Sequence, residues 1–283
     1  MSTLHTRSVM SLLTAMTADP DLLGTALARQ AVIHALAGVV GGLAMAATVL
    51  ADKVYPPLSA RRRAGGDRRW RTVATHLDHA ATGAQRAEHL LNSAAGRCHR
   101  LIRDGEIVEY HGSLKPQHGR YGIDGPCICV DCEDRGLTLQ LHPVRGGHLL
   151  TCVNPESVSP IPALDTDLSR HARQAERLLS TGLDPLPASL DAQHALYQAR
   201  SLAVLTSRTR TVLAGWEDLF GRMLNRHWWS FDTDGGSPWT LKQHIVTAFE
   251  QAGNNFPQVT ADLRRAVGVL AAIEAEPAGT RAA

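Results

Sequence analysis

The sequence predicts a mainly α-helical protein, an antiparallel helical bundle built from both ends of the chain around a small inserted antiparallel β-barrel. Apolar residues recur every three or four positions over most of the chain, as on one face of a helix. Within residues 105–160 the apolar period changes to two, and glycines separate short runs, as in antiparallel strands. We therefore expect bundle helices in 1–104, a β module in 105–160 and further bundle helices in 161–283.

Composition limits the kind of protein. The chain has 283 residues, of which 44% are hydrophobic and only 5% aromatic, so Ala, Leu and Val must fill the core. A formal net charge of +2 does not indicate a polyanionic partner unless charge is clustered locally. Five cysteines without a visible secretory signal favour a reducing, cytoplasmic compartment over a disulfide framework.

The first 52 residues are expected to be helical, with an interruption at Asp19-Pro20-Asp21, where the proline can open a second helix. Residues 31–50 carry no formal charge, and this run is long enough to span a membrane. Its alanines, its glycines and His34 make it only mildly apolar, which also suits the central helix of a soluble bundle. Membrane attachment through residues 31–50 is thus an alternative to a core helix.

Long amphipathic helices are expected on both sides of the β module. Residues 67–103 and 189–229 each carry apolar residues in alternating steps of three and four, typical of a helix seam. Because both seams need partners, we expect the two helices to pack against each other. The last helix, residues 238–275, should break at the Gly-Asn-Asn of residues 253–255, which are weak helix formers.

The β module contains strand-like runs at residues 106–112, 121–130, 136–143 and 148–155. Its segments VEYHGSLKPQHGRYGI and HLLTCVNPESVSPI combine a strand, a polar loop, a strand with a tight turn, and a last strand closing into Ser157-Val158. In this layout the module resembles a small SH3-like barrel, over about one fifth of the chain. The resemblance implies a fold that binds peptides, nucleic acid or other domains, and it does not choose among them.

Three of the five cysteines lie close together in GPCICVDCEDRG, residues 125–136. Cys129-Val-Asp-Cys132 is a CxxC pair, a spacing that can offer two thiolates to one zinc ion from a tight turn. If Cys127 and Cys129 lie in a strand, they share a face because side chains alternate. The candidate fourth ligand is Cys152, on the last predicted strand.

Spacing alone leaves the fourth ligand open. The alternatives to a fourth cysteine are the histidines of the β module, His111, His118, His142 and His148. A CxCxxC run without a second CxxC pair is compatible with structural zinc, with simple packing of small sulfur side chains, and with thiol redox chemistry. Redox chemistry has the least support, because no βαβ pattern surrounds the CxxC pair. Structural zinc is therefore the candidate cofactor.

Positive charge is concentrated in SARRRAGGDRRWR, residues 59–71. The basic and aromatic side chains of this segment are Arg61, Arg62, Arg63, Arg68, Arg69, Trp70 and Arg71. Guanidinium groups suit phosphate and a tryptophan can stack on a base, so these residues are a candidate nucleic-acid site. The same charges suit an anionic membrane surface or a solvated linker.

The sequence shows no catalytic motif of the common kinds: GxSxG, HExxH, a P-loop, a dinucleotide fingerprint or a kinase set. His76 and His79 lie three residues apart on a predicted helix. Carboxylate–histidine metal sites in bundles need matching glutamates on other helices, so we interpret this pair as solvent-facing.

These observations favour a non-enzymatic helical scaffold that carries a small β interaction module for a protein partner. The first alternative is nucleic-acid binding through the arginine-rich segment 61–71 and the β module. The second is a membrane-attached accessory role through residues 31–50. Narrow alanine-rich seams also suit a homo-oligomer, although helices of one chain satisfy them equally.

Overall fold

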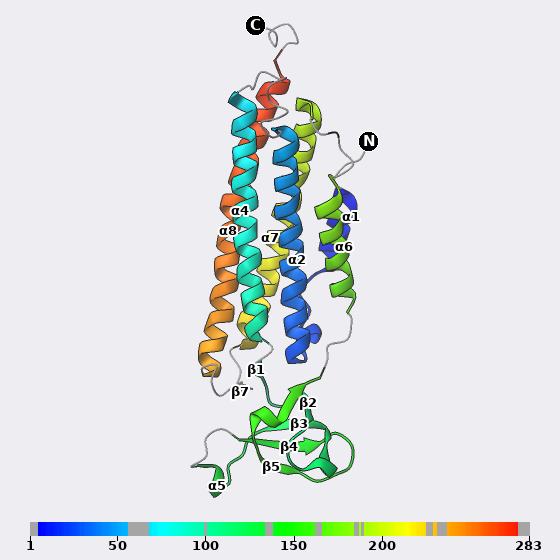
Figure 1. Ribbon diagram of the computed structural model, residues 1–283, viewed down its shortest axis with the longest axis vertical. Coiled ribbons are helices and arrows are strands. Elements are labelled where there is room, and N and C mark those ends of the chain that lie inside the picture. The colour runs from blue at the N-terminus through cyan, green and yellow to red at the C-terminus, as the bar shows by residue number, and fades with distance from the viewer. Residues whose placement is uncertain are drawn as a thin grey trace.

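Apolar side chains at helical spacing assemble into one bundle core, and the β module lies at one end of that bundle (Figure 1). The predicted fold class, mainly α with a small antiparallel β insertion, is confirmed. The computed structural model describes residues 5–55, 68–98, 101–133, 138–161, 166–183, 187, 190–224, 229–230 and 237–276.

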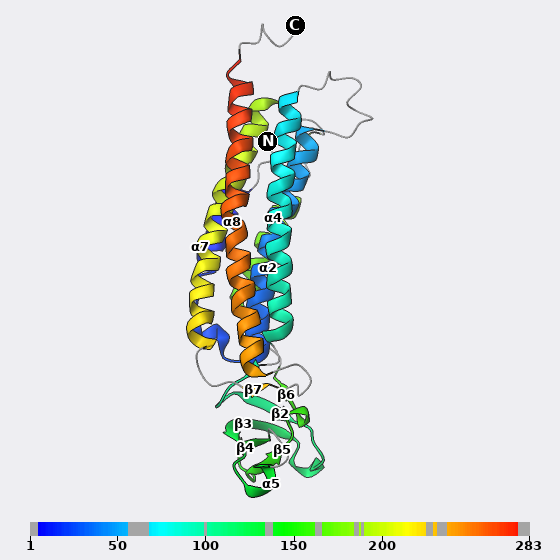
Figure 2. The ribbon, with the colours of Figure 1, turned by 90° about the vertical axis from the view of Figure 1, so that its left-hand side faces the viewer.

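The bundle is built from helices on both sides of the β module. They are α1 (Thr6–Ala15), α2 (Ala26–Val54), α4 (Arg68–Cys98), α6 (Asp167–Thr181), α7 (Ala192–Leu224) and α8 (Pro238–Glu274). The expected interruption is present as a 3-10 turn, η1 (Pro20–Leu23), which Asp19 caps by accepting the backbone N–H of Asp21. α2, α4, α7 and α8 run along the long axis, and α6 packs against α2 (Figures 1 and 2).

The uncharged run of residues 31–50 lies within α2, in the middle of the bundle. α2 contacts α4, α6 and α7, and 61% of its most apolar 18-residue window is buried. By length and composition the 29-residue helix is also apolar enough to cross a membrane. Gly42 lets α6 approach closely, because a Cβ at that position would lie 3.1 Å from the Cα of Glu176. In this structure, α2 packs as a core helix.

The seam of α4 packs chiefly against α2 and α8 rather than against α7. Small buried residues occupy two adjacent rows of α4, so that a helix can pack on each side. At Gly83 the two helices approach closely, because a Cβ there would lie 2.7 Å from Cγ2 of Val259 on α8. The expected pairing of 67–103 with 189–229 is therefore wrong, and α7 makes its main contacts with α8 and α2.

The expected break in the last helix is also wrong, because α8 continues from Pro238 to Glu274 with Pro257 inside it. Buried residues recur at helical spacing on both sides of residues 253–255: Phe249, Ala252, Phe256, Val259 and Leu263. Helix propensity penalises glycine by about 1 kcal/mol and proline by about 3 kcal/mol. Burial of this continuous apolar stripe outweighs that penalty, since tertiary packing provides most helical stability.

Within the described residues the β module forms a five-stranded antiparallel sheet in the order β5-β4-β3-β2-β6. The strands are β2 (Ile107–Tyr110), β3 (Gly119–Pro126), β4 (Leu139–Pro143), β5 (Leu150–Val153) and β6 (Val158–Pro160). A 3-10 turn, η3 (Pro155–Ser157), precedes β6, which returns to pair with β2. The module has its own apolar core: Ile102, Val108, Tyr110, Tyr121, Ile123, Leu139, Leu141, Leu150, Val153 and Val158.

A short ladder that the sequence did not predict joins the bundle to the β module. Strand β1 (Leu101–Ile102) pairs antiparallel with β7 (Trp229–Ser230), so the chain leaving α4 is tied to the chain that follows α7. Side chains alternate along β1, and Leu101 enters the bundle core while Ile102 enters the module core. The two cores therefore meet at a single dipeptide.

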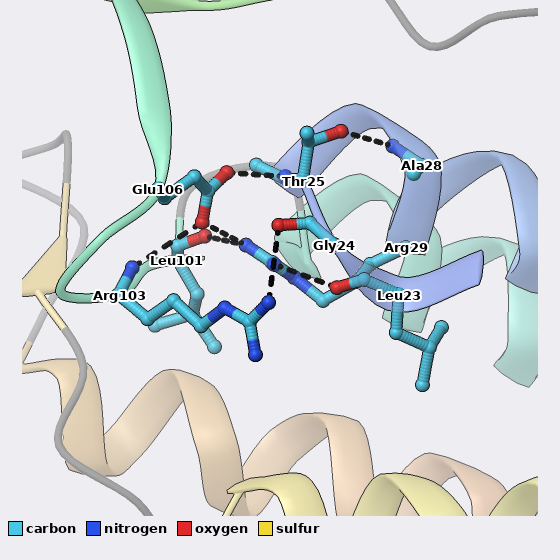
Figure 3. Close-up of polar contacts among 9 residues, drawn as sticks. Leu23, Gly24, Thr25, Ala28, Arg29, Leu101, Arg103 and Glu106 are labelled. Atoms are coloured by element: carbon cyan, nitrogen blue, oxygen red, sulfur yellow. Dashed lines mark hydrogen bonds and ion pairs between the residues drawn. The ribbon is translucent and has the colours of Figure 1, made fainter. Parts of the chain in front are cut away.

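A buried ion pair fixes this junction (Figure 3). Arg29, at the start of α2, is fully buried and lies 2.9 Å from the Glu106 carboxylate, at the start of the β module. Arg29 also donates to the carbonyl oxygens of Leu23 and Leu101. The Glu106 carboxylate in turn accepts the backbone N–H of Ala26, in the first turn of α2, where the helix dipole favours an anion.

Replacing Arg29 by leucine should lower the free energy of unfolding by about 3–5 kcal/mol, because Glu106 is left buried without its cation. Adding Glu106→Leu should restore part of that loss, since no unpaired buried charge remains. Urea unfolding followed by circular dichroism measures both variants.

The control for this experiment is Arg222→Leu, which breaks an exposed pair with Asp218 on α7. It should cost less than about 1 kcal/mol, because exposed ion pairs contribute little. A double variant as unstable as Arg29→Leu alone would contradict the role assigned to the buried pair.

Candidate metal centre

Four cysteines from separate parts of the β module converge at its end remote from the bundle. Cys127 follows β3, Cys129 lies in the next loop, Cys132 lies in the short helix α5 (Val130–Glu133), and Cys152 lies in β5. Their four sulfur atoms all lie within 4.8 Å of one another. Both views place α5 at the tip of the molecule (Figures 1 and 2).

The loop that carries three of these cysteines begins earlier than the sequence predicts. β3 ends at Pro126, so Cys127 and Cys129 do not share a strand face, and the expected strand 121–130 is too long. The N–H of Cys127 still donates to the carbonyl of Thr138, after which the chain turns. The N–H of Cys132 donates to the carbonyl of Cys129 at 3.0 Å, and this bond closes the CxxC turn.

Cys152 completes the set through an unusual backbone conformation. With φ at 57° it is the only non-glycine residue with positive φ in the described part of the chain. The conformation costs a non-glycine residue about 1–2 kcal/mol. It breaks the alternation of β5, in which Thr151 and Cys152 are both exposed between buried Leu150 and Val153. The thiol is thereby directed away from the module core and toward the other cysteines.

The sulfur geometry fits a tetrahedral ion. A tetrahedron with metal–sulfur bonds of about 2.3 Å has sulfur atoms about 3.8 Å apart. The Cys152 sulfur lies 3.8 Å from that of Cys127 and 3.3 Å from that of Cys129. The four thiols could therefore hold one metal ion, with a fourth sulfur as the last ligand in place of a histidine. His118, one of the expected alternatives, is instead hydrogen-bonded to the carbonyl of Gly112 at 2.7 Å.

Proton affinities within the cluster are uneven. Backbone N–H groups of Cys129 and Cys152 point at the Cys127 sulfur and lower the pKa of that thiol to about 7. Hydrogen bonds to the sulfurs of Cys129 and Cys132 raise the pKa of the Cys152 thiol to about 12. Adjacent thiolates repel one another, so a cation at the centre is what would allow all four to ionise together.

The fifth cysteine, Cys98, belongs to a different environment. It is fully buried in the bundle core at the end of α4. Burial raises the pKa of the Cys98 thiol to about 11, so the thiolate is disfavoured there. At this position Cys98 acts as a small packing residue of the bundle core.

The described members of the candidate nucleic-acid site lie at the other end of the bundle from the β module. Arg61, Arg62 and Arg63 are outside the described residues, and Arg68, Arg69, Trp70 and Arg71 open α4. The 31 residues of α4 separate the two ends by about 46 Å, so the structure does not bring this segment and the module together.

The described members of the segment also make contacts within the chain. Arg69 forms an ion pair with Glu276. Arg71 donates to the Tyr55 hydroxyl at 3.2 Å and stacks over its ring. Trp70 is partly buried against the bundle core. A phosphate or a base would have to compete with these contacts.

Sequence reasoning overlooked two aliphatic residues between the metal-capable cysteines. Ile128 is 91% exposed and Val130 is 82% exposed. The sequence carried one signal for them, which is their place between cysteines that a single ion would draw together, although the strand alternation expected for residues 127–130 is absent. We call Ile128 and Val130 the knuckle.

The fold and the four thiols define a helical-bundle protein with a metal-capable β module. No protein-family model, curated protein or solved structure matches the chain.

In the metal-free protein, the four cluster thiols should react with a thiol reagent under native conditions, Cys127 first because the pKa of its thiol is lowered to about 7. Cys98 should react only after unfolding, because it is fully buried in the bundle core and the reagent cannot reach it. Adding Cd²⁺ should protect the four together, since one ion engages all of them. Absorbance of the released chromophore counts the thiols. The arrangement would be contradicted if Cd²⁺ protected only two thiols, or if the Cys98 thiol reacted with the reagent as fast as the other four.

Proposed function

We propose that this protein is a non-enzymatic helical scaffold whose β module, stapled by a structural zinc ion, binds a protein partner through the knuckle. The observation that carries the proposal is the pairing of a four-sulfur cluster with two exposed aliphatic residues between its cysteines, Ile128 after β3 and Val130 at the start of α5. The cluster supplies rigidity and the knuckle supplies a contact surface.

Zinc suits the four sulfurs best. Tetrahedral sulfur sites select zinc or iron, and four thiolates leave no open position for a substrate or water, as in structural sites. Ten of the described residues form the module core, which is small for an independent fold, so a metal staple would add needed stability. Zinc-bound thiolates require reduced cysteines, which fits a cytoplasmic location.

We also propose that the module is an SH3-like barrel. The strand order β5-β4-β3-β2-β6 supports this, because the last strand returns to pair with the first strand of a four-stranded meander. The 3-10 turn η3 directly before β6 gives further support. Such barrels serve as interaction modules with varied ligands, so the ligand must be argued from the exposed residues.

The knuckle favours a protein partner over nucleic acid. Single exposed aliphatic residues are common on protein surfaces. Here, however, two of them are held between metal-capable cysteines, so that little side-chain and loop freedom would be lost on binding. Asp131 is exposed directly after Val130, and its carboxylate would repel a phosphate backbone. The chemistry fits a partner with an apolar pocket that accepts two branched side chains.

The two alternatives have less support. A nucleic-acid site would rely on the arginine-rich segment alone, at the opposite end of the bundle from the module. Membrane insertion of α2 would require it to leave α4, α6 and α7, exposing the core that they share. The crosslinking experiment below tests whether the knuckle contacts a different protein or a second copy of this chain.

Protein purified from zinc-containing medium should lose one equivalent of zinc per chain on Cys129→Ser or Cys152→Ser, because either change removes a ligand. Cys98→Ala, in the bundle core, should leave the zinc content unchanged. Mass spectrometry of the metal measures both. Removal of zinc should also speed amide exchange in β3 and β4 while α4 stays protected, since only the module depends on the staple. Equal metal content in all the variants would contradict the zinc site.

A photo-crosslinking residue placed at position 128 in the native cell should join the chain to one discrete protein. The same residue at position 144, where Val144 is 44% exposed on another loop of the module, should not. With that partner purified, Ile128→Ser should raise the Kd about tenfold or more, because burying one aliphatic side chain contributes about 1.5–3 kcal/mol. Val144→Ser is the matched control and should leave the Kd unchanged.

Three results would overturn the proposed partner class. One is a crosslink at position 128 to nucleic acid, and another is equal crosslinking at positions 128 and 144. The third is a crosslink to a second copy of this chain, which would make the knuckle an oligomer contact instead.

A further inference from the structure

Two histidines and one carboxylate meet where α4 packs on α8, in the half of the bundle away from the β module. His76 and His79 lie one turn apart on α4, and Asp262 lies on α8. One ligand atom from each side chain lies within 4.8 Å of the other two. The sequence-based interpretation of a solvent-facing pair holds for His79 but not for His76, whose side chain is only 22% exposed.

Asp262 is an unusual residue for its position. Its side chain is 2% exposed, in the same helix stripe as the buried Val259 and Leu263. A carboxylate in such a place is tolerated only when its oxygens are paired. Gln258 donates to Oδ2 at 2.8 Å, and His76 Nδ1 lies 3.3 Å from Oδ1. The carboxylate is thus held in a fixed orientation facing the α4 histidines.

We propose that His76, His79 and Asp262 bind a divalent transition-metal ion between α4 and α8. Two imidazoles and one carboxylate are a ligand set that suits zinc, cobalt and nickel. The exposed His79 gives an ion access from solvent, and water would complete the coordination. Gln258, hydrogen-bonded to the carboxylate oxygen Oδ2, acts as a positioning residue.

One contact competes with the ion. Arg265 donates to Oδ1 of Asp262 at 3.0 Å, and a cation close to a metal ion weakens its binding. The Arg265 side chain is 56% exposed, so it can turn into solvent when the ion arrives. Because the Asp262 carboxylate is buried, the bound ion would have to replace the positive charge that Arg265 supplies in its absence.

The proposed ion would clamp two helices that are far apart in the sequence. His76 and Asp262 are separated by 186 residues, and α4 and α8 make the most extensive helix contact of the bundle. The site is independent of the four cysteines, which lie at the tip of the β module. If no ion binds at the histidines, the proposed function of the β module is unaffected. If the β module binds no zinc or partner, the proposed histidine site is likewise unaffected.

The experiment titrates Co²⁺ into full-length protein whose cysteine cluster is already filled with zinc. One further ion per chain should bind, with the weak visible bands of nitrogen and oxygen ligands and without sulfur-to-cobalt charge transfer. His79→Ala should weaken binding at least about tenfold, because one ligand is lost. His79 is exposed, so the variant should fold normally. His89→Ala, at another exposed histidine of α4, is the matched control and should bind Co²⁺ as the wild type does.

A thermal melt gives a second measurement. Co²⁺ should raise the Tm of the wild type and of His89→Ala, since an ion that binds only the folded state stabilises it. It should not raise the Tm of His79→Ala. Absence of saturable Co²⁺ binding at millimolar concentration, or binding that His79→Ala leaves unchanged, would overturn the proposal.

Discussion

The buried pair of Arg29 and Glu106 determines how the two halves of this molecule are arranged. The bundle and the β module have separate apolar cores, and apolar packing is non-directional, so it would not by itself fix one orientation. An ion pair with no solvent access tolerates little displacement, because each charge must keep its partner and its hydrogen bonds. Arg29 bridges the start of α2, the chain leaving α4 and the first residues of the module. The module is therefore a fixed extension of the bundle.

Polar groups gather at both ends of the β module. Near the bundle, Glu106 accepts backbone N–H groups of Ala26 and Arg103 and binds Arg29. At the tip, four cysteines bring together a loop, a short helix and a strand. The apolar core between them has only short strands around it. With the proposed zinc ion bound, the small sheet would be braced at both of its ends.

The sequence predicted the elements that depend on local pattern. Seams such as those of α4 and α7 were visible because burial follows a helical period, and the interruption at Pro20 was visible because proline has one preferred place in a helix. The predicted break in α8 was wrong, because burial of a continuous apolar stripe outweighs the low helix propensity of residues 253–255. Cys152 was identified as a candidate ligand, whereas the positive φ that turns it toward the other cysteines left no signal in the sequence. Likewise, nothing local joins His76 to Asp262, because only the folded bundle brings them together.

The order of elements along the chain has a consequence for synthesis of the protein. α8, the main partner of α4, begins about 140 residues after α4 ends. At about 5–20 residues per second, the ribosome needs roughly 7–28 seconds to cover that distance. The β module lies within this interval and has mostly neighbouring strands as partners, so it can fold while α4 still lacks its main partner. Until α8 emerges, the alanine-rich face of α4 that it will cover stays exposed to solvent. During this interval a chaperone that covers the face would protect the nascent chain from aggregation.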